Sequence, residues 1–292
     1  MADSLMRRPL VVIKARYELM PSLKEVYVEG KDIELYRWFF QAKNMHHVKV
    51  YSIDTVEIDE KIINSYGLNE ESNQHKLIAL SEELQNDYKE DSLKVRCIVD
   101  ADYDRHLKTT RNNNFLEYTD YTSVEMYFFN EPALDKFIGI VLKGLPVKCS
   151  LLIRNMAKVL ERVYLIRLSN EKLKWGMRFP KKETLKKYFV WTKTKIEFKE
   201  KEFIKNYLIM NGKGKKKAEF ECIMKEYEGN LEADARHNIR GHDFTWALFH
   251  VSKKIKKRIG FSTWERMESA LLGCVEMAFV EDEQLFQRLS IL

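Results

Sequence analysis

The chain has 292 residues, of which 45% are hydrophobic and 32% charged, and its formal net charge is +6. This composition is typical of a globular protein with a sizeable core, and it excludes a fibrous or intrinsically disordered chain. The first ten residues lack the apolar core of a signal peptide, and no apolar run is long enough to span a membrane. We therefore expect a soluble, cytoplasmic protein that does not contact membranes.

The first half of the chain alternates short apolar runs with amphipathic segments. Residues 1–22, which contain one apolar run at 10–13 ahead of a proline, predict an edge element or packing arm, and residues 54–69 predict a polar, irregular insertion. The strands are expected at 25–28, 48–53, 95–99 and 115–118, and the helices at 32–43, at 72–88 and from about 123. This strand–helix rhythm predicts an α/β fold with a mostly parallel sheet flanked by helices.

The second half predicts a mainly helical, basic region. Apolar residues recur at helical spacing in 153–168, 203–210, 218–227, 244–257 and 264–279. We place the domain boundary near residue 145, which gives domains of 1–145 and 146–292. Clusters of lysine between 172 and 258 favour an anionic partner, with nucleic acid ahead of membrane. Solvated lysines that serve only solubility are the alternative.

The four cysteines stand far apart, with no Cys-x-x-Cys pair. We expect them to be buried, reduced thiols rather than part of a disulfide or zinc framework. They are Cys97, Cys149, Cys222 and Cys274.

Carboxylates follow two of the predicted strands. Glu29 comes directly after 25–28, and Asp100 and Asp102 come after 95–99. Because the carboxyl ends of parallel strands meet at one edge of a sheet, these side chains should converge there. Hard oxygen ligands suit Mg²⁺, so we predict Glu29, Asp100 and Asp102 as metal ligands. A chance Glu-Gly pair and a solvated Asp-rich turn are the alternatives.

These motifs resemble a known family. Val-Tyr-Val-Glu-Gly at 26–30 and Ile-Val-Asp-Ala-Asp at 98–102 look like the signature of the TOPRIM fold, in which a glutamate follows the first strand and Asp-x-Asp follows the third. Residues 119–128 and Arg-Gly-His-Asp at 240–243 narrow the resemblance to the TOPRIM-like effector nucleases of ABC-ATPase-linked anti-phage systems. The resemblance covers roughly residues 23–130 and is thin elsewhere.

The resemblance implies a metal-dependent endonuclease. Glu29 would act as general acid/base or metal-linked carboxylate, Asp100 and Asp102 would bind Mg²⁺, for which Mn²⁺ can substitute, and Glu125 would complete the catalytic set. OLD-type relatives often carry a second acid where this chain has Ile33, which leaves a second metal position in doubt. The family also implies a homodimer as the active form, restraint by an ABC-type ATPase partner, and cleavage of tRNA.

Two other functions stay open at this stage. One is an OLD-type DNA nuclease or nickase, because nothing in the residues selects ribose. The other is a catalytically idle subunit that binds nucleic acid or the ATPase.

The remaining motifs have mainly structural interpretations. We expect His242 and Asp243 to pack against or cap the helix that follows, with contact to substrate left open. Residues 212–215 lack the Walker ending, so we expect no ATP hydrolysis. Aromatic residues at 188–191, beside Lys186 and Lys187, are expected in the core, with stacking on unpaired bases as the alternative.

Overall fold

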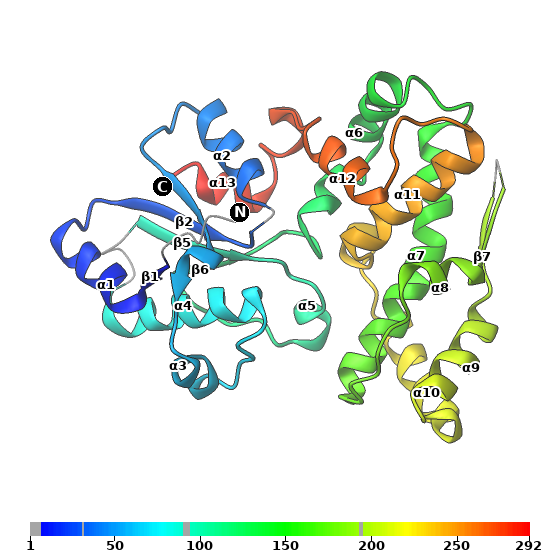
Figure 1. Cartoon of the computed structure of the whole chain (residues 1–292), viewed down its shortest axis with the longest axis horizontal. Coiled ribbons are helices and arrows are strands. Elements are labelled where there is room, and N and C mark those ends of the chain that lie inside the picture. The colour runs from blue at the N-terminus through cyan, green and yellow to red at the C-terminus, as the bar shows by residue number, and fades with distance from the viewer. Residues whose placement is uncertain (1–6, 31, 90–93, 193–194) are drawn as a thin grey trace. The chain divides into compact units, whose positions relative to one another are not determined.

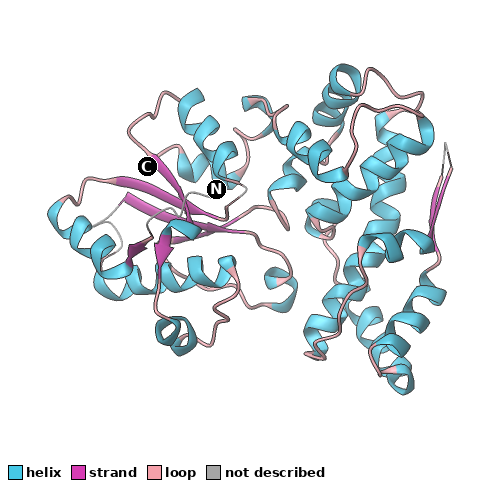
Figure 2. Cartoon of the chain, viewed as in Figure 1, coloured by secondary structure: helices cyan, strands magenta, loops and turns pink. Residues whose placement is uncertain are grey.

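The computed structural model describes residues 7–30, 32–89, 94–192 and 195–292 (Figures 1 and 2). The chain divides into two compact units. Unit 1 comprises Met1–Ala101, Thr110–Asp120 and Glu276–Leu292, and unit 2 comprises Asp102–Thr109 and Tyr121–Val275. These bounds differ from the expected 1–145 and 146–292, because the C-terminal segment packs in unit 1 and residues after 121 join the helical unit.

Unit 1 contains a four-stranded sheet in the order β3-β2-β5-β6, and all of its strand pairs are parallel. Its strands are β2 (Lys24–Val28), β3 (Lys49–Ser52), β5 (Lys94–Val99) and β6 (Leu116–Tyr118). The mostly parallel sheet flanked by helices is therefore confirmed, and the four strands lie within two residues of their predicted bounds.

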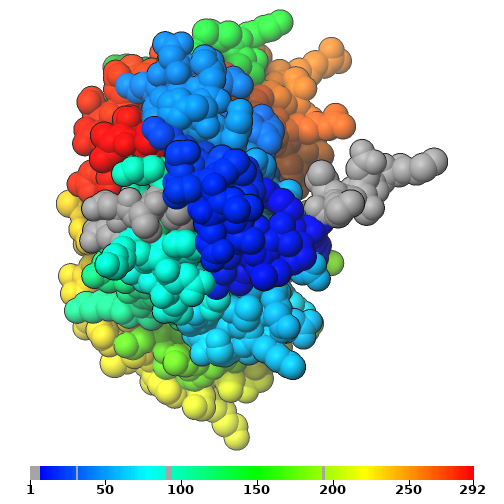
Figure 3. Space-filling model, turned by 90° about the vertical axis from the view of Figure 1, so that its left-hand side faces the viewer, coloured from blue at the N-terminus to red at the C-terminus, as the bar shows by residue number. Residues whose placement is uncertain are grey.

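Helices cover both faces of this sheet. Side chains alternate along a strand, so Tyr27, Cys97 and Val99 face one way and join the core formed with α1 (Leu10–Leu19) and α4 (Asn73–Asp87). The other face carries α2 (Ile33–Ala42), against which the C-terminal helix α13 (Gln284–Leu289) packs through Phe286 (Figure 1). The space-filling view shows the red C-terminal segment beside the blue α2 (Figure 3). Central strands buried on both faces explain the nearly continuous apolar runs.

Three local predictions were only partly right. The described part of 1–22 includes a short edge strand, β1 (Arg8–Pro9), which fits the expected edge element. Residues 10–13 begin α1, a regular helix, because Leu10, Ile13 and Tyr17 recur at helical spacing and are buried. The supposed irregular insertion contains structure: a 3-10 turn (Ile53–Thr55), β4 (Val56–Glu57) paired in parallel with β1 (Arg8–Pro9), and α3 (Glu60–Ser65). The helix expected from about residue 123 is a 3-10 helix, Val124–Phe128.

Unit 2 is mainly helical, as predicted. Its long helix α7 (Cys149–Leu173) packs against α10 (Lys217–Glu228) and α11 (Gly241–Ile255), and α11 also packs against α12 (Trp264–Leu272). Unit 2 also contains the helices α5 (Asp104–Leu107), α6 (Glu131–Lys136), α8 (Lys182–Leu185) and α9 (Glu200–Met210), and α6 is continued by a π-helical turn (Phe137–Val141). The strands β7 (Phe189–Trp191) and β8 (Ile196–Phe198) form an antiparallel pair. Helix α12 ends before Gly273 rather than at 279.

The cysteines only partly match their prediction. All four are free thiols, but only Cys97 and Cys149 are buried, whereas Cys222 is exposed and Cys274 is partly exposed. Among the described residues, no helix combines the length and apolarity that crossing a bilayer requires.

One buried carboxylate in unit 1 generates a stability prediction. Glu25 on β2 is fully buried, accepts hydrogen bonds from the hydroxyls of Tyr17 and Tyr27, and pairs with Arg16 at 2.7 Å. Removing the cation from a buried ion pair is strongly destabilising, so Arg16→Ala should lower the free energy of unfolding by about 3 kcal/mol in urea denaturation. Arg37→Ala removes an exposed partner of Glu34 and should cost less than about 1 kcal/mol. Equal losses in the two variants would contradict this account.

Candidate functional site

Glu29 and Asp100 lie at the same edge of the sheet in unit 1. Strands β2 and β5 are hydrogen-bonded neighbours in parallel register, with Tyr27 opposite Cys97. Glu29 follows the last residue of β2, and Asp100 follows the last residue of β5. The structure thus brings these two predicted ligands to the carboxyl ends of adjacent strands, as the sequence led us to expect.

The carboxylates at this edge act on a buried tyrosine that no motif in the sequence indicates. The side chain of Tyr36 on α2 is 1% exposed, and its hydroxyl has no hydrogen-bond partner among the described residues. Burial raises the pKa of Tyr36 well above its ordinary value, and the negative charges of Asp32, Asp100, Asp120 and Glu29 raise it further. Four carboxylates are therefore close enough to act on one buried hydroxyl.

Asp120 also belongs to this edge of unit 1. It follows β6 by two residues, and its carboxylate oxygens accept the backbone N–H of Leu285 at 3.1 and 3.2 Å. Strand β6 pairs with β5 in parallel, so a carboxylate just after it could have been chosen from the sequence by the same rule that selected Asp100.

Asp102 and Glu125, the other two predicted site residues, belong to unit 2. Asp102 has a φ of 38°, in the left-handed region that a residue other than glycine rarely adopts. Its backbone N–H donates to the carbonyl of Thr122 at 2.8 Å, and its own carbonyl accepts from the hydroxyl of Tyr164 at 3.0 Å. The structure thus places Glu29 and Asp100 in unit 1, and the other two predicted site residues in unit 2. That all four converge in one site stays a prediction.

The charges around Asp102 are mixed. Burial raises the pKa of Asp102, the attraction of Arg240 opposes that rise, and repulsion from Asp104 and Glu125 adds to it. The guanidinium Nε of Arg240 lies 3.9 Å from a carboxylate oxygen of Asp102. An unusual backbone conformation combined with a perturbed carboxylate is typical of functional positions.

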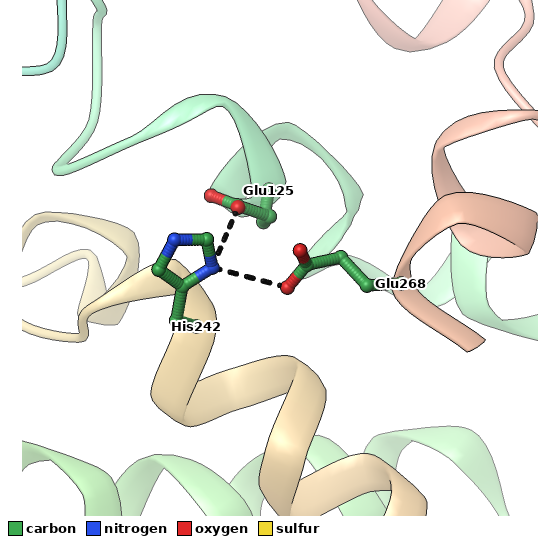
Figure 4. Close-up of side chains that lie close together, drawn as sticks. All are labelled: Glu125, His242 and Glu268. Atoms are coloured by element: carbon green, nitrogen blue, oxygen red, sulfur yellow. Dashed lines mark hydrogen bonds and ion pairs between the residues drawn. The ribbon is translucent and has the colours of Figure 1, made fainter. Parts of the chain in front are cut away.

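Unit 2 also contains a three-residue cluster that could hold a metal ion (Figure 4). Nδ1 of His242 lies 3.1 Å from a carboxylate oxygen of Glu125 and 3.1 Å from one of Glu268. Both glutamates are buried, and Glu268 also accepts from the hydroxyl of Thr245 at 2.6 Å. The three side chains come from the 3-10 helix, α11 and α12.

Gly241 permits the close approach of Glu125 to the start of α11. A Cβ at this position would lie 2.2 Å from a carboxylate oxygen of Glu125 and 2.2 Å from the hydroxyl oxygen of Ser123. Glycine is therefore the residue that leaves room for both. The carboxylate also gains from the positive end of the helix dipole.

The cluster shifts the pKa values of its members. Hydrogen bonds to Glu125 and Glu268 raise the pKa of His242 to about 10, against the opposing effect of burial. Burial alone would raise the pKa of Glu125, but the hydrogen bond and charge of His242 and the hydroxyl of Ser123 lower it. In the absence of a metal ion, His242 is therefore an imidazolium between two buried carboxylates at neutral pH.

Of the two roles expected for Asp243, packing and capping, the structure shows packing. The N-cap residue is Arg240, and no side chain caps this helix end. Asp243 is instead buried and ion-paired with Lys182 and with Arg167, the latter at 3.1 Å. Burial would raise the pKa of Asp243, but these two cations lower it well below its usual range.

Glu268 could not be identified from the sequence alone. It lies on α12, far along the chain from Glu125, and no local motif marks it. His242 was noticed only as part of a short motif, and its two partners are visible only in the folded chain.

No known protein-family description matches the chain, and no curated protein is significantly similar to it in sequence.

The raised pKa of His242 predicts a pH dependence of stability. Histidine in the unfolded chain titrates near about 6.5. A raised folded-state pKa contributes stability that is complete below about pH 6.5 and is lost as the pH rises through about 10. In metal-free protein, we expect the free energy of unfolding of wild type to fall over this range more steeply than that of His242→Asn. Parallel pH profiles in urea denaturation would rule out this role of the imidazolium.

Proposed function

We propose that the protein is a metal-dependent endonuclease that cleaves phosphodiester bonds at the carboxyl edge of the unit 1 sheet. The observation that carries the proposal is the placement of Glu29 and Asp100 at the ends of the adjacent parallel strands β2 and β5, beside the buried hydroxyl of Tyr36. Several carboxylates near one buried polar group form an arrangement that a hydrated divalent cation would stabilise.

The donor set fits Mg²⁺. Glu29 and Asp100 would hold the ion, since Mg²⁺ binds through one or two carboxylates and keeps several waters. When bound, such an ion stabilises negative charge on a scissile phosphate and orients the attacking water. The Glu125–His242–Glu268 cluster offers a nitrogen as well as oxygens, which favours Mn²⁺ or a later transition metal over Mg²⁺.

The residues at the carboxyl edge are proposed to have distinct roles in the reaction. Glu29 is proposed as general acid/base or metal-linked carboxylate, in line with its position in the TOPRIM signature. Tyr36 is proposed as a positioning residue: its high pKa keeps the hydroxyl protonated, so it can donate a hydrogen bond to a carboxylate or to a water at the edge. The motif resemblance alone assigns Asp102 and Glu125 to the same catalytic set.

The substrate and partners rest on the motif resemblance alone. The motifs resemble those of TOPRIM-like anti-phage effectors, and most of all AriB, the nuclease effector of the PARIS system. On that basis we propose tRNA as the substrate, an ABC-type ATPase as the restraining partner, and a homodimer as the active form. The basic helical unit is proposed to hold the substrate backbone.

Removal of Glu29 tests the function directly. Cells that express wild type should acquire discrete new tRNA ends, and Glu29→Ala should reduce their number by about a hundredfold or more, the usual scale for loss of an acid–base group. The measurement is sequencing of total RNA ends, with the ATPase present and absent. Glu34→Ala is the matched control, because Glu34 is an exposed carboxylate on α2 and should leave cleavage unchanged.

The outcomes separate the candidate functions. Glu29-dependent DNA breaks with intact RNA would support the OLD-type DNA nuclease instead. No Glu29-dependent change in either nucleic acid would overturn the nuclease proposal and leave a binding subunit. With purified protein, a larger loss of Mg²⁺-dependent cleavage in Asp100→Asn than in Glu268→Gln would place the essential ion in unit 1.

Tyr36→Phe separates a functional hydroxyl from a structural one. The substitution keeps the ring that stacks on Phe286 and removes a buried hydroxyl that lacks a partner in the described chain. Stability should therefore stay the same or rise by about 1 kcal/mol. Cleavage should fall by at least about tenfold, and the Mg²⁺ concentration for half-maximal activity should rise. A stabilised variant with unchanged cleavage and Mg²⁺ dependence would exclude the positioning role.

A further inference from the structure

We propose that a basic pocket in unit 2 binds a phosphodiester segment of a single-stranded nucleic acid, with one base against its aromatic wall. The pocket is a cavity of about 560 Å³ between strand β7, the start of α9 and the end of α11. The inference rests on the proposed function only in naming a nucleic acid as the source of the phosphates.

The lining of the pocket has one sign of charge. Of the described residues that line it, none is a carboxylate and five are lysines, which stand beside His250 and the β7 strand; the lysines are Lys186, Lys187, Lys199, Lys253 and Lys254. Among the described residues, the one ion pair that these lysines form joins Lys199 to Glu202 at 4.0 Å, between exposed side chains. Like charges gathered in a concave site attract a multiply charged anion far better than scattered surface lysines do.

An aromatic wall backs these lysines. The ring of Trp191 stacks on Phe189 at 5.0 Å with an interplanar angle of 15°, and it meets Trp246 edge-on at 5.7 Å. The imidazole of His250 lies 6.0 Å from the Trp191 ring and 5.1 Å from the Trp246 ring. These mutual contacts fix the wall in place, so an aromatic ligand that packs on it loses little freedom to side-chain ordering.

Two polar groups in the wall are suited to a ligand. The indole N–H of Trp191 is buried and has no acceptor among the described residues, which is costly unless a ligand or water supplies one. Burial, Lys186 and Lys253 together lower the pKa of His250 to about 4, so its imidazole is neutral at pH 7 and offers both a donor and an acceptor. The site therefore combines phosphate-binding cations with hydrogen-bonding groups beside aromatic rings.

A nucleotide segment matches this combination better than a simple anion does. The lysines account for phosphates, whereas the wall of Phe189 and Trp191 accounts for a flat, apolar base with polar edges. Bases in duplexes are stacked on one another and are not presented to such a wall, so the ligand should be single-stranded or a loop. The lining residues of this pocket, at 186, 187, 189–191, 199, 250, 253 and 254, lie outside the part of the chain that the motif resemblance covers.

Binding to a short labelled oligonucleotide tests the pocket. Full-length protein is titrated into a fluorescein-labelled single-stranded RNA and, separately, into DNA of the same sequence. EDTA is present to prevent cleavage. Binding is followed by fluorescence anisotropy between about 50 and 200 mM NaCl. The double variant Lys253→Ala/Lys254→Ala should bind at least about tenfold more weakly, and the slope of log K against log salt should become less steep by about 1.4. Trp191→Phe should weaken binding about threefold to tenfold with the slope unchanged.

The matched control removes the same charge elsewhere in unit 2. Lys205→Ala/Lys225→Ala takes two exposed lysines from α9 and α10, and it should change affinity by less than about twofold if binding is local to the pocket. Equal weakening by the two double variants would show diffuse attraction to a basic surface and overturn the proposal. A normal melting temperature for each variant excludes unfolding as the cause.

The two nucleic acids identify the source of the ligand. Tighter binding of RNA would show that the site also reads the 2′-hydroxyl, and equal binding would show that it reads the phosphodiester and base alone; both support the pocket. Because binding is measured in EDTA, failure of the nuclease proposal leaves this result intact. Pocket-dependent binding without any cleavage would overturn the proposed function and retain the binding site.

Discussion

Parallel pairing between β2 and β5 determines which side chains leave the unit 1 sheet at its carboxyl edge. Side chains alternate between the two faces of a strand. The register that buries Tyr27 and Cys97 against α4 therefore also sets which residues of β2 and β5 lie at the carboxyl edge. A slip of one residue would exchange the two faces and bury the wrong set. The positions of Glu29 and Asp100 are thus tied to the packing of the core, and neither can move without a cost in buried apolar surface.

Unit 2 depends on a different constraint, the balance of buried charge at the start of α11. Glu125 and Glu268 are matched by His242, and Asp243 is matched by Arg167 and Lys182. Taking so many ions out of water costs more free energy than their attraction returns in many proteins. Well-packed apolar side chains of similar volume would often be as stable in these positions.

Local patterns predicted most of the fold. The strands of unit 1 follow apolar, β-branched runs, and the long helices of unit 2 follow regular apolar spacing, so both were found near their observed bounds. The short helix α1 was missed because its apolar run also fits an extended arm. The Glu29 and Asp100 pair followed from the strand-end rule. The Glu125, His242 and Glu268 cluster did not, because three distant segments must fold before their side chains meet.

The C-terminal segment has a consequence for the order in which the protein is made. Phe286 packs on α2, and the backbone of Leu285 binds Asp120, yet both are synthesised after all of unit 2. The sheet edge with Glu29 and Asp100 therefore remains incomplete while the ribosome translates the helical unit. A chain that stalls or is truncated before α13 would carry the acidic residues without the contacts that α13 makes with α2 and Asp120. The contacts of α13 at this edge thus form only after the helical unit has been translated.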